Sequence, residues 1–459
     1  MRATFAKPLI GLVAAALVCG GVIGGLGAAV LLARAPSASA SRTVAAASDA
    51  DAVLAVLKAK FRRPPTVPFP ADNPYSDDKH ALGEALFHDP RLSANGTISC
   101  ASCHVRTKGF ADGRTRGEGV AKRPIVRHTP TLWNLAWATH VFWDGRARSL
   151  EEQVAGPIES PDEMGLPMAE AVRRLAKDPA LANAFAKAFP RTPEISRATI
   201  AKAIAVYERT LVSPPTRFDR WIEGDAAALT RSEVAGFRLF TGKAGCSNCH
   251  SGFAFTDYAF HDIGRPDEDR GRGTVLRLEA AEHAFKTPGL REIGHSAPYM
   301  HDGSLKSLDE VSRHYENGII RRSTLSKDLP TRISLTDRER ADLIAFLRTL
   351  DSATDPRPPA RIVPGQARPA LPVSFTTTVT QHEKRFDPAH IGLKRGARLW
   401  ILNNDTRTHN ARVFAPKLDY DSGAQEPGET VEIAFPHEGE FLVFCGIHPN
   451  MELWVDVAR

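Results

Sequence analysis

The sequence contains two cysteine pairs, each with two residues between the cysteines and a histidine directly after the second one. This spacing suits covalent attachment of a cofactor. They are Cys100, Cys103 and His104 in "CASCH" and Cys246, Cys249 and His250 in "CSNCH". Two thiols one helical turn apart can add to the two vinyl groups of a haem, and the adjacent imidazole then faces the iron. The alternatives are a zinc half-site, which would need further ligands at matching spacing, and a thiol redox pair, which would not need the histidine. The two motifs therefore predict two covalently bound c-type haems.

A second group of potential ligands lies near the end of the chain. Cys445, His448 and Met451 have the spacing C-x-x-H-x-x-M in "VFCGIHPNM". Taken alone, this pattern is equally consistent with a buried free cysteine and two bystanders. His409 ends another expected strand 36 positions before Cys445. Two histidines and a cysteine with a weak axial methionine are the ligands of a type 1 copper site, so the four residues predict one.

The elements that must hold these ligands change type along the chain. A chain of 459 residues is too long for one ordinary core. Helix-start patterns of the S/T-x-x-E type recur at Ser149, Thr230, Ser307 and Thr336. Apolar residues then follow a helical period in 198–212 and 338–350, whereas 398–405, 430–435 and 440–445 alternate like half-buried strands. We therefore expect a mainly α-helical body followed by a small all-β domain.

The N-terminus begins with Arg2 and Lys7 and continues with an apolar run from Leu9 to Leu32 and small residues up to Ala40. This pattern predicts export to the periplasm, by a cleaved signal peptide or, as we favour, an uncleaved membrane anchor. The net charge of +6 is spread out, which excludes a nucleic-acid tract. The expected segments are 1–41 (signal or anchor), 42–71 (tether), 72–225 and 226–352 (two helical lobes), 353–372 (Pro-rich linker) and 373–459 (β domain).

Residues 72–352 resemble the di-haem cytochrome c peroxidases and their relatives of the MauG type. The resemblance includes "RHTPTLWNLAW" (127–137), "FWDGRARSLEEQVAGPIESPDEMG" (142–165) and "TPGLREIGHSAPYMHDGSL" (287–305). It implies two cytochrome c-like lobes with one haem each. Residues 373–459 look like a cupredoxin of the plastocyanin or amicyanin kind, a β-sandwich that includes all four copper ligands.

The resemblance also implies roles for individual residues. The haem at His104 would be peroxidatic and the haem at His250 would transfer electrons, with Trp143 as the bridge between them. Core packing is a compatible role for Trp143. Glu163 would be the distal acid–base group, and Gln153 would line its pocket. Without the resemblance, Glu163 reads more simply as a loop carboxylate that caps the next helix.

Three departures from the family pattern bear on the chemistry. No histidine occurs in 105–127, where many of these peroxidases have one that blocks the first haem, so we expect that haem to be open in every redox state. His128 replaces an asparagine often found beside a calcium ion, which disfavours calcium. Ala297 stands where the sixth ligand of the second haem is often a methionine. Tyr299 or Met300 must then serve, and the sequence does not choose between them.

These residues predict a periplasmic peroxidase that reduces hydrogen peroxide to water with electrons relayed through copper and the second haem. The expected donor is a small soluble cytochrome c or cupredoxin. Two alternatives stay open. One is a MauG-like oxidase that stores two oxidising equivalents and acts on a protein or small-molecule substrate; the other is a non-enzymatic electron carrier. Di-haem relatives often dimerise, but no residue here indicates an oligomeric state.

Overall fold

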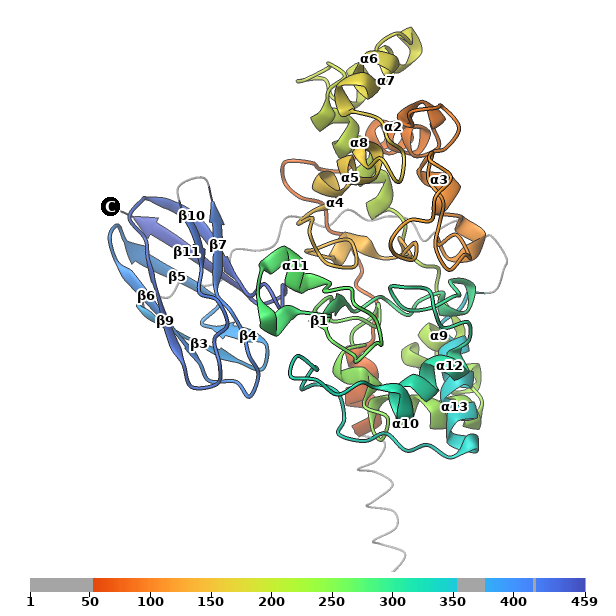
Figure 1. Ribbon diagram of the computed structural model, residues 1–459, viewed down its shortest axis with the longest axis vertical. Coiled ribbons are helices and arrows are strands. Elements are labelled where there is room, and N and C mark those ends of the chain that lie inside the picture. Colours follow the sequence, from red (N-terminus) through yellow and green to blue (C-terminus); the bar gives the residue numbers. More distant parts are fainter. Residues whose placement is uncertain (1–52, 353–375, 416–417, 459) are drawn as a thin grey trace, which may run out of the picture. The chain divides into compact units, whose positions relative to one another are not determined.

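The computed structural model describes residues 53–352, 376–415 and 418–458 (Figure 1). The segment 1–41 and the linker 353–372 lie outside these residues. Within the described ranges, no helix is long and apolar enough to cross a membrane. Residues 54–459 belong to one compact unit.

The first half of the helical part surrounds the first cysteine pair. Its helices are α2 (Asp77–Phe87), α3 (Cys100–Cys103), α4 (Leu150–Gln153), α5 (Ala155–Glu159), α6 (Met168–Leu175), α7 (Pro179–Ala188) and α8 (Arg197–Arg209). Short 3-10 turns occupy Pro90–Leu92, Arg106–Lys108 and Leu135–Trp137. Apolar side chains of α2, α6, α7 and α8 form one buried cluster, against which Cys100 packs. The first motif is therefore anchored on a rigid helical core.

The second half repeats this plan with fewer helices. Its helices are α9 (Arg217–Glu223), α10 (Arg231–Thr241), α11 (Arg272–Leu276), α12 (Leu308–Arg313) and α13 (Asp337–Arg348). A π-helical turn occupies His314–Gly318, and 3-10 turns occupy Ala226–Ala228, Cys246–Asn248, Glu279–Ala281 and Ile293–His295. Strands β1 (Phe260–His261) and β2 (Phe285–Lys286) pair antiparallel. A cluster rich in phenylalanine, including Phe237, Phe255 and Phe346, forms the core, and Cys246 packs against it.

A glycine at the main helix crossing is common to both halves. A Cβ at Gly83 of α2 would lie 2.0 Å from the carbonyl oxygen of Ala203 in α8. A Cβ at Gly236 of α10 would lie 2.0 Å from the carbonyl oxygen of Asp342 in α13. In each half the backbones of the first and last long helices thus approach too closely for any side chain at this position.

The helix starts expected from S/T-x-x-E patterns are confirmed. Ser149, Thr230, Ser307 and Thr336 are the N-caps of α4, α10, α12 and α13, and each side chain accepts a hydrogen bond from the backbone N–H three residues later. These bonds satisfy amide groups that have no partner within the helix. The helical periods expected in 198–212 and 338–350 correspond to α8 and α13.

Part of the expected tether packs against the helical body instead. Phe61 is buried in the phenylalanine-rich cluster, and Val67 and Phe69 form a small buried cluster with Val206 of α8. Prolines keep this segment extended, so its apolar side chains can reach successive sites on the body. The segment from Phe61 to Phe69 is therefore part of the folded protein.

The C-terminal region consists of two β-sheets. One has the strand order β5-β11-β10-β7-β8 and the other the order β4-β3-β6-β9. The strands are β3 (Thr378–His382), β4 (Arg385–Asp387), β5 (His390–Lys394), β6 (Arg398–Asn403), β7 (Arg412–Ala415), β8 (Leu418–Asp421), β9 (Thr430–Ala434), β10 (Gly439–Phe444) and β11 (Glu452–Ala458). Alternate residues of both sheets, such as Leu399, Val443 and Val455, share one core. The expected β region and its period of two are confirmed.

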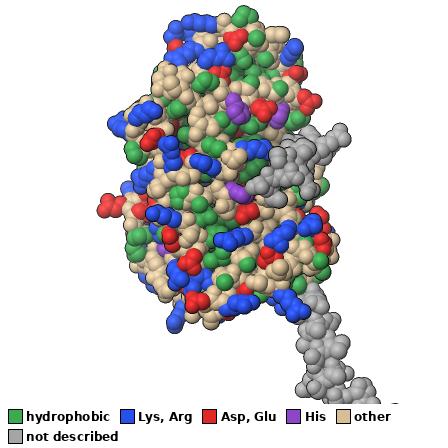
Figure 2. All heavy atoms as spheres, turned by 90° about the vertical axis from the view of Figure 1, so that its right-hand side faces the viewer, with side chains coloured by type: hydrophobic (Ala, Val, Ile, Leu, Met, Phe, Trp, Pro, Cys, Tyr) green, Lys and Arg blue, Asp and Glu red, His purple; other side chains and the backbone are tan. Residues whose placement is uncertain are grey.

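Charged side chains of both signs are interspersed on the face that Figure 2 presents. This distribution agrees with the small net charge of the sequence.

Candidate functional site

The first C-x-x-C-H motif lines a cavity of about 460 Å³, and its lining includes Cys100, Cys103 and His104. His104 Nδ1 lies 2.8 Å from the carbonyl oxygen of Phe110 and donates to it, which leaves Nε2 available as a ligand. Burial lowers the pKa of His104, so the imidazole is neutral, as iron ligation requires. Burial also raises the pKa of Cys103 to about 11.

The same cavity contains the expected distal residues. Glu163 and Gln153 both line it. Glu163 lies in a turn in which its N–H donates to the carbonyl oxygen of Ser160, and its own carbonyl oxygen accepts from Val120 N–H at 2.8 Å. Burial raises the pKa of the Glu163 carboxyl, and Arg146 only partly opposes this effect. A carboxyl with a raised pKa keeps its proton to a higher pH than an ordinary glutamate does, which suits a group that both accepts and releases one.

The second C-x-x-C-H motif lines a separate cavity of about 210 Å³, which includes Cys246, Cys249 and His250. His250 Nδ1 lies 3.0 Å from the carbonyl oxygen of Phe255, so this histidine has the same orientation as His104. Tyr299 and Met300 both line this cavity. The Tyr299 hydroxyl donates to the carbonyl oxygen of Ile293 at 3.1 Å, and burial raises its pKa to about 12. Either side chain is within the site, so the choice of sixth ligand stays open.

Trp143 lines both cavities, as do His128 and Lys286. The Trp143 indole donates to the carbonyl oxygen of His128 at 2.8 Å, and its own carbonyl oxygen accepts from Lys286 N–H at 2.8 Å. The ring is thus fixed at the boundary between the two motifs.

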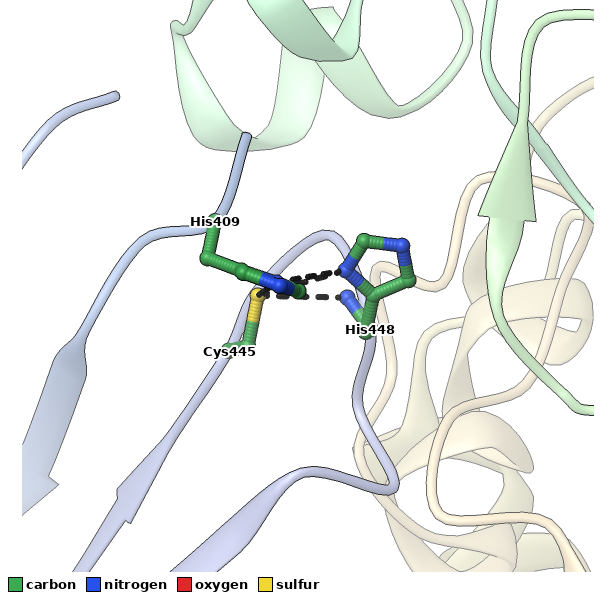
Figure 3. Close-up of side chains that lie close together, drawn as sticks. All are labelled: His409, Cys445 and His448. Atoms are coloured by element: carbon green, nitrogen blue, oxygen red, sulfur yellow. Dashed lines mark hydrogen bonds between the residues drawn. The ribbon is translucent and has the colours of Figure 1, made fainter. Parts of the chain in front are cut away.

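The C-terminal region brings three of the four expected copper ligands together (Figure 3). His409 Nδ1 and His448 Nδ1 are 3.0 Å apart, and Cys445 Sγ lies 3.7 Å and 3.8 Å from them. An ion at the centre of this triangle would be about 2 Å from each atom, the length of a metal–ligand bond. The side chain of Met451 is buried in the adjoining core, and its carbonyl oxygen accepts from Cys445 N–H at 3.1 Å.

The surroundings of this triangle favour the thiolate form of Cys445, and the contacts with Cys445 and Asp405 raise the pKa of His409 despite its burial. Burial alone would raise the pKa of Cys445, but the hydrogen bond and charge of His409 lower it overall. His409 Nε2 lies 3.1 Å from Asp405 Oδ2, a carboxylate–histidine pair that fixes the ring. Burial holds the pKa of His448 well below its ordinary value. The donor set therefore fits a copper ion of type 1.

Comparison with known proteins identifies the helical part. The family model described as di-haem cytochrome c peroxidase matches residues 77–227. The methylamine utilization protein MauG of Methylorubrum extorquens is 45% identical over 353 residues, which cover 76% of this chain and 96% of that protein. Cytochrome c551 peroxidase of Nitrosomonas europaea is 37% identical over 292 residues (62% of this chain, 84% of that protein). A solved MauG-like protein associated with microbial copper homeostasis has a TM-score of 0.59 at 33% identity, covering 64% of this chain and 95% of that chain.

The chain belongs to the di-haem cytochrome c peroxidase family.

Membership confirms the prediction of an oxidoreductase of the cytochrome c peroxidase type and supports two haem cofactors. In this di-haem peroxidase the two cavities are the places where the haems fit, because each combines two cysteines with a histidine whose Nδ1 is already engaged. Among the described residues, the groups of three side chains that could hold a metal ion are His409, Cys445 and His448, and Cys249, Asp257 and His261.

Two residues of the copper-type site were missed at the sequence level. Asn410 Oδ1 accepts from Gly446 N–H at 2.7 Å and lies 3.5 Å from Cys445 Sγ. Asp405 holds His409 as described above. The sequence could have indicated Asn410, because it directly follows the expected ligand His409. It could also have indicated Asp405, because Asp405 and His409 are four residues apart.

Proposed function

We propose that this di-haem peroxidase reduces hydrogen peroxide to water in the periplasm, with electrons entering through a type 1 copper bound by His409, Cys445, His448 and Met451. The donor would be a small soluble cytochrome c or cupredoxin. The arrangement of one cavity carries this proposal: His104, Gln153 and Glu163 line it, and Trp143 connects it to the cavity of His250.

The protein's part in the reaction is proton transfer and orientation. A haem held by Cys100, Cys103 and His104 would supply the redox centre that reduces peroxide. Glu163 takes the proton from the inner oxygen of the peroxide and delivers it to the leaving oxygen. Gln153 lines the same cavity and can orient the peroxide through its amide. Trp143, held by His128, provides an aromatic group between the two haem sites.

The test is steady-state peroxide consumption by the oxidised, copper- and haem-loaded protein with a reduced cytochrome or cupredoxin. Immediate turnover is expected, and Glu163→Gln should lower it by about 10²- to 10⁴-fold, the usual contribution of general acid–base catalysis. Glu84→Gln, on the exposed side of α2, is the matched control and should turn over normally. Equal turnover by wild type and Glu163→Gln would refute the assigned role.

The MauG-like alternative is favoured by the absence of histidine from 105–127 and by the 45% identity to MauG. In that case peroxide without a donor should give a long-lived oxidised spectrum, and oxidation of a protein or small-molecule substrate should follow. If neither turnover nor such a spectrum occurs, and the ferric protein fails to bind cyanide, the chain is an electron carrier.

A further inference from the structure

His261 of β1 lies between the copper-type site and the second C-x-x-C-H motif. Its ring centroid is 6.2 Å from that of His448, at an interplanar angle of 63°. Its ligand atoms also lie within 4.8 Å of Cys249 Sγ and of the Asp257 carboxylate. One buried side chain thus contacts both an expected copper ligand and an expected point of haem attachment.

Hydrogen bonds on both ring nitrogens fix the orientation of His261. Nε2 lies 2.9 Å from Asp257 Oδ2, and Nδ1 lies 2.9 Å from Ser326 Oγ. The side chain is only 4% exposed, so it has no room to leave this position. A ring held in one orientation gives an electron a path of constant geometry.

The copper-binding loop is also attached to the second half of the helical body by its backbone. Ile447 O accepts from Phe260 N–H at 3.2 Å, and Gly446 O accepts from Arg272 Nε at 2.9 Å. Asn450 Nδ2 donates to Asp257 O at 2.5 Å. These contacts lie on either side of His448, so they hold its ring against β1.

Ion pairs strengthen the same contact. Lys384 Nζ lies 2.7 Å from Asp328 Oδ2 and 3.5 Å from Asp257 Oδ2. Arg407 Nε donates to Asp328 Oδ1 at 2.6 Å. Asp328 is buried, so screening by salt affects these pairs less than it affects surface pairs. Leu276 of α11 adds apolar contact, since it belongs to the core of the β region.

We propose that His261 is the residue through which an electron passes from the copper site to the haem attached at Cys249. This inference rests on the proposed function. In the step, one electron supplied by the external donor leaves Cu(I), which becomes Cu(II), and reduces the ferric haem iron to the ferrous state. No bond breaks and no proton has to move. The route runs from the ligand His448 to His261 and then to Cys249.

A competing connection leads toward the first haem site. Arg272, which holds Gly446 O, also donates through Nη1 to the carbonyl oxygens of Asp144 and Gly145, next to Trp143. This path runs through hydrogen bonds and a guanidinium group and contains no aromatic contact with a copper ligand. We therefore expect it to carry little of the electron flow.

The experiment measures electron transfer within the fully loaded protein. A flash-generated one-electron reductant reduces the copper, and the recovery of its thiolate absorption is followed together with the appearance of ferrous haem. His261→Leu should slow this transfer by about tenfold or more. His382→Leu, on an exposed part of the β region, should leave the rate unchanged. His261→Gln keeps polar contacts to Asp257 and Ser326 while removing the ring, so it serves if His261→Leu fails to fold.

The rates can be compared only among proteins with intact centres. Each variant must therefore match the wild type in copper content, in the thiolate absorption band and in the haem spectra. An unchanged rate in both His261 variants overturns the role of His261 while leaving the copper relay intact. Absence of transfer in wild-type protein that holds all three centres refutes the relay itself. Zinc content should also be measured. If the wild-type protein binds one equivalent of zinc and His261→Gln binds none, then Cys249, Asp257 and His261 form a metal site, and this result too overturns the proposal.

Discussion

The indole nitrogen of Trp143 donates to the backbone carbonyl of His128, 2.8 Å away, and both residues line both haem cavities. The hydrogen bond fixes the ring plane as well as its position, because the indole has one donor and the carbonyl oxygen of His128 accepts it. We therefore expect electron transfer between the two cavities to use this ring.

Substitution of Trp143 by Phe keeps an aromatic ring but removes this hydrogen bond. We expect peroxide turnover with an external donor to fall by about tenfold, because the smaller ring leaves a gap and is free to tilt. Ligand binding at the first haem should stay normal, since Trp143 is assigned no role in binding peroxide. Peroxide turnover and cyanide binding are both measured in Trp143→Phe and in the wild type. Trp400→Phe, at the surface of β6, is the control, and an equal loss there would attribute the effect to general instability.

The pH dependence of turnover should report the raised pKa of Glu163. The carboxylate form is needed to accept the first proton, so turnover should fall as the pH decreases through this pKa. Because burial raises the pKa, the loss should begin at a higher pH than for an ordinary glutamate. The low-pH limb of kcat/KM should be absent in Glu163→Gln.

Glu208 provides the necessary comparison, since it lines the same cavity and burial raises its pKa to about 8. In Glu208→Gln the limb assigned to Glu163 should persist. If the low-pH limb disappears in Glu208→Gln, the group that titrates is Glu208 and not Glu163.

The buried pair of Asp219 and Arg291 should dominate the stability of the second half. Arg291 Nη1 and Nη2 each donate to one oxygen of Asp219 at 2.8 Å, and Arg63 Nε lies 3.0 Å from the same carboxylate. Asp219→Ala leaves two arginines without their buried partner and should cost about 3–5 kcal/mol in the free energy of unfolding. Urea unfolding checks this value. Asp225→Ala, whose partner Arg220 is largely exposed, should cost no more than about 1 kcal/mol.

The same pair predicts a pH effect on stability. Burial favours the neutral acid, but Arg291 and Arg63 together lower the pKa of Asp219 below its ordinary value. The stabilisation is therefore complete above the pKa of the unfolded state and is lost as the pH falls toward the folded pKa. Wild type should lose stability over this acidic range, and Asp219→Ala should lose less.

Local spacing explains what the sequence could predict. The two C-x-x-C-H motifs and the helix caps are each encoded within a few residues. The motifs line two cavities and the capping residues begin helices, as the sequence predicts. Residues that meet only through folding gave no such signal. His261 and His448 are far apart in the chain, and the burial of Phe61 depends on a cluster built from distant helices. The adjacent residues Tyr299 and Met300 line the same cavity, so position alone cannot choose between them.

Replacement of Cys445 by Ser should remove the copper centre while leaving the haem sites intact. Serine offers a neutral hydroxyl in place of the thiolate, whose pKa His409 lowers despite burial. We expect loss of the thiolate absorption band and of the added copper. Haem absorption and cyanide binding should not change, because neither cavity includes Cys445.

Copper should also stabilise the wild-type protein but not this variant. A metal that binds only the folded state raises stability by about 2.7 kcal/mol at 100 times its Kd. Addition of Cu(II) should therefore raise Tm in the wild type, and acidification should weaken this effect because protons compete for Cys445, His409 and His448. His437→Ser, at an exposed position of the β region, should respond to copper as the wild type does. An equal rise of Tm in Cys445→Ser would mean that copper binds elsewhere, and the relay through this loop would then lose its first centre.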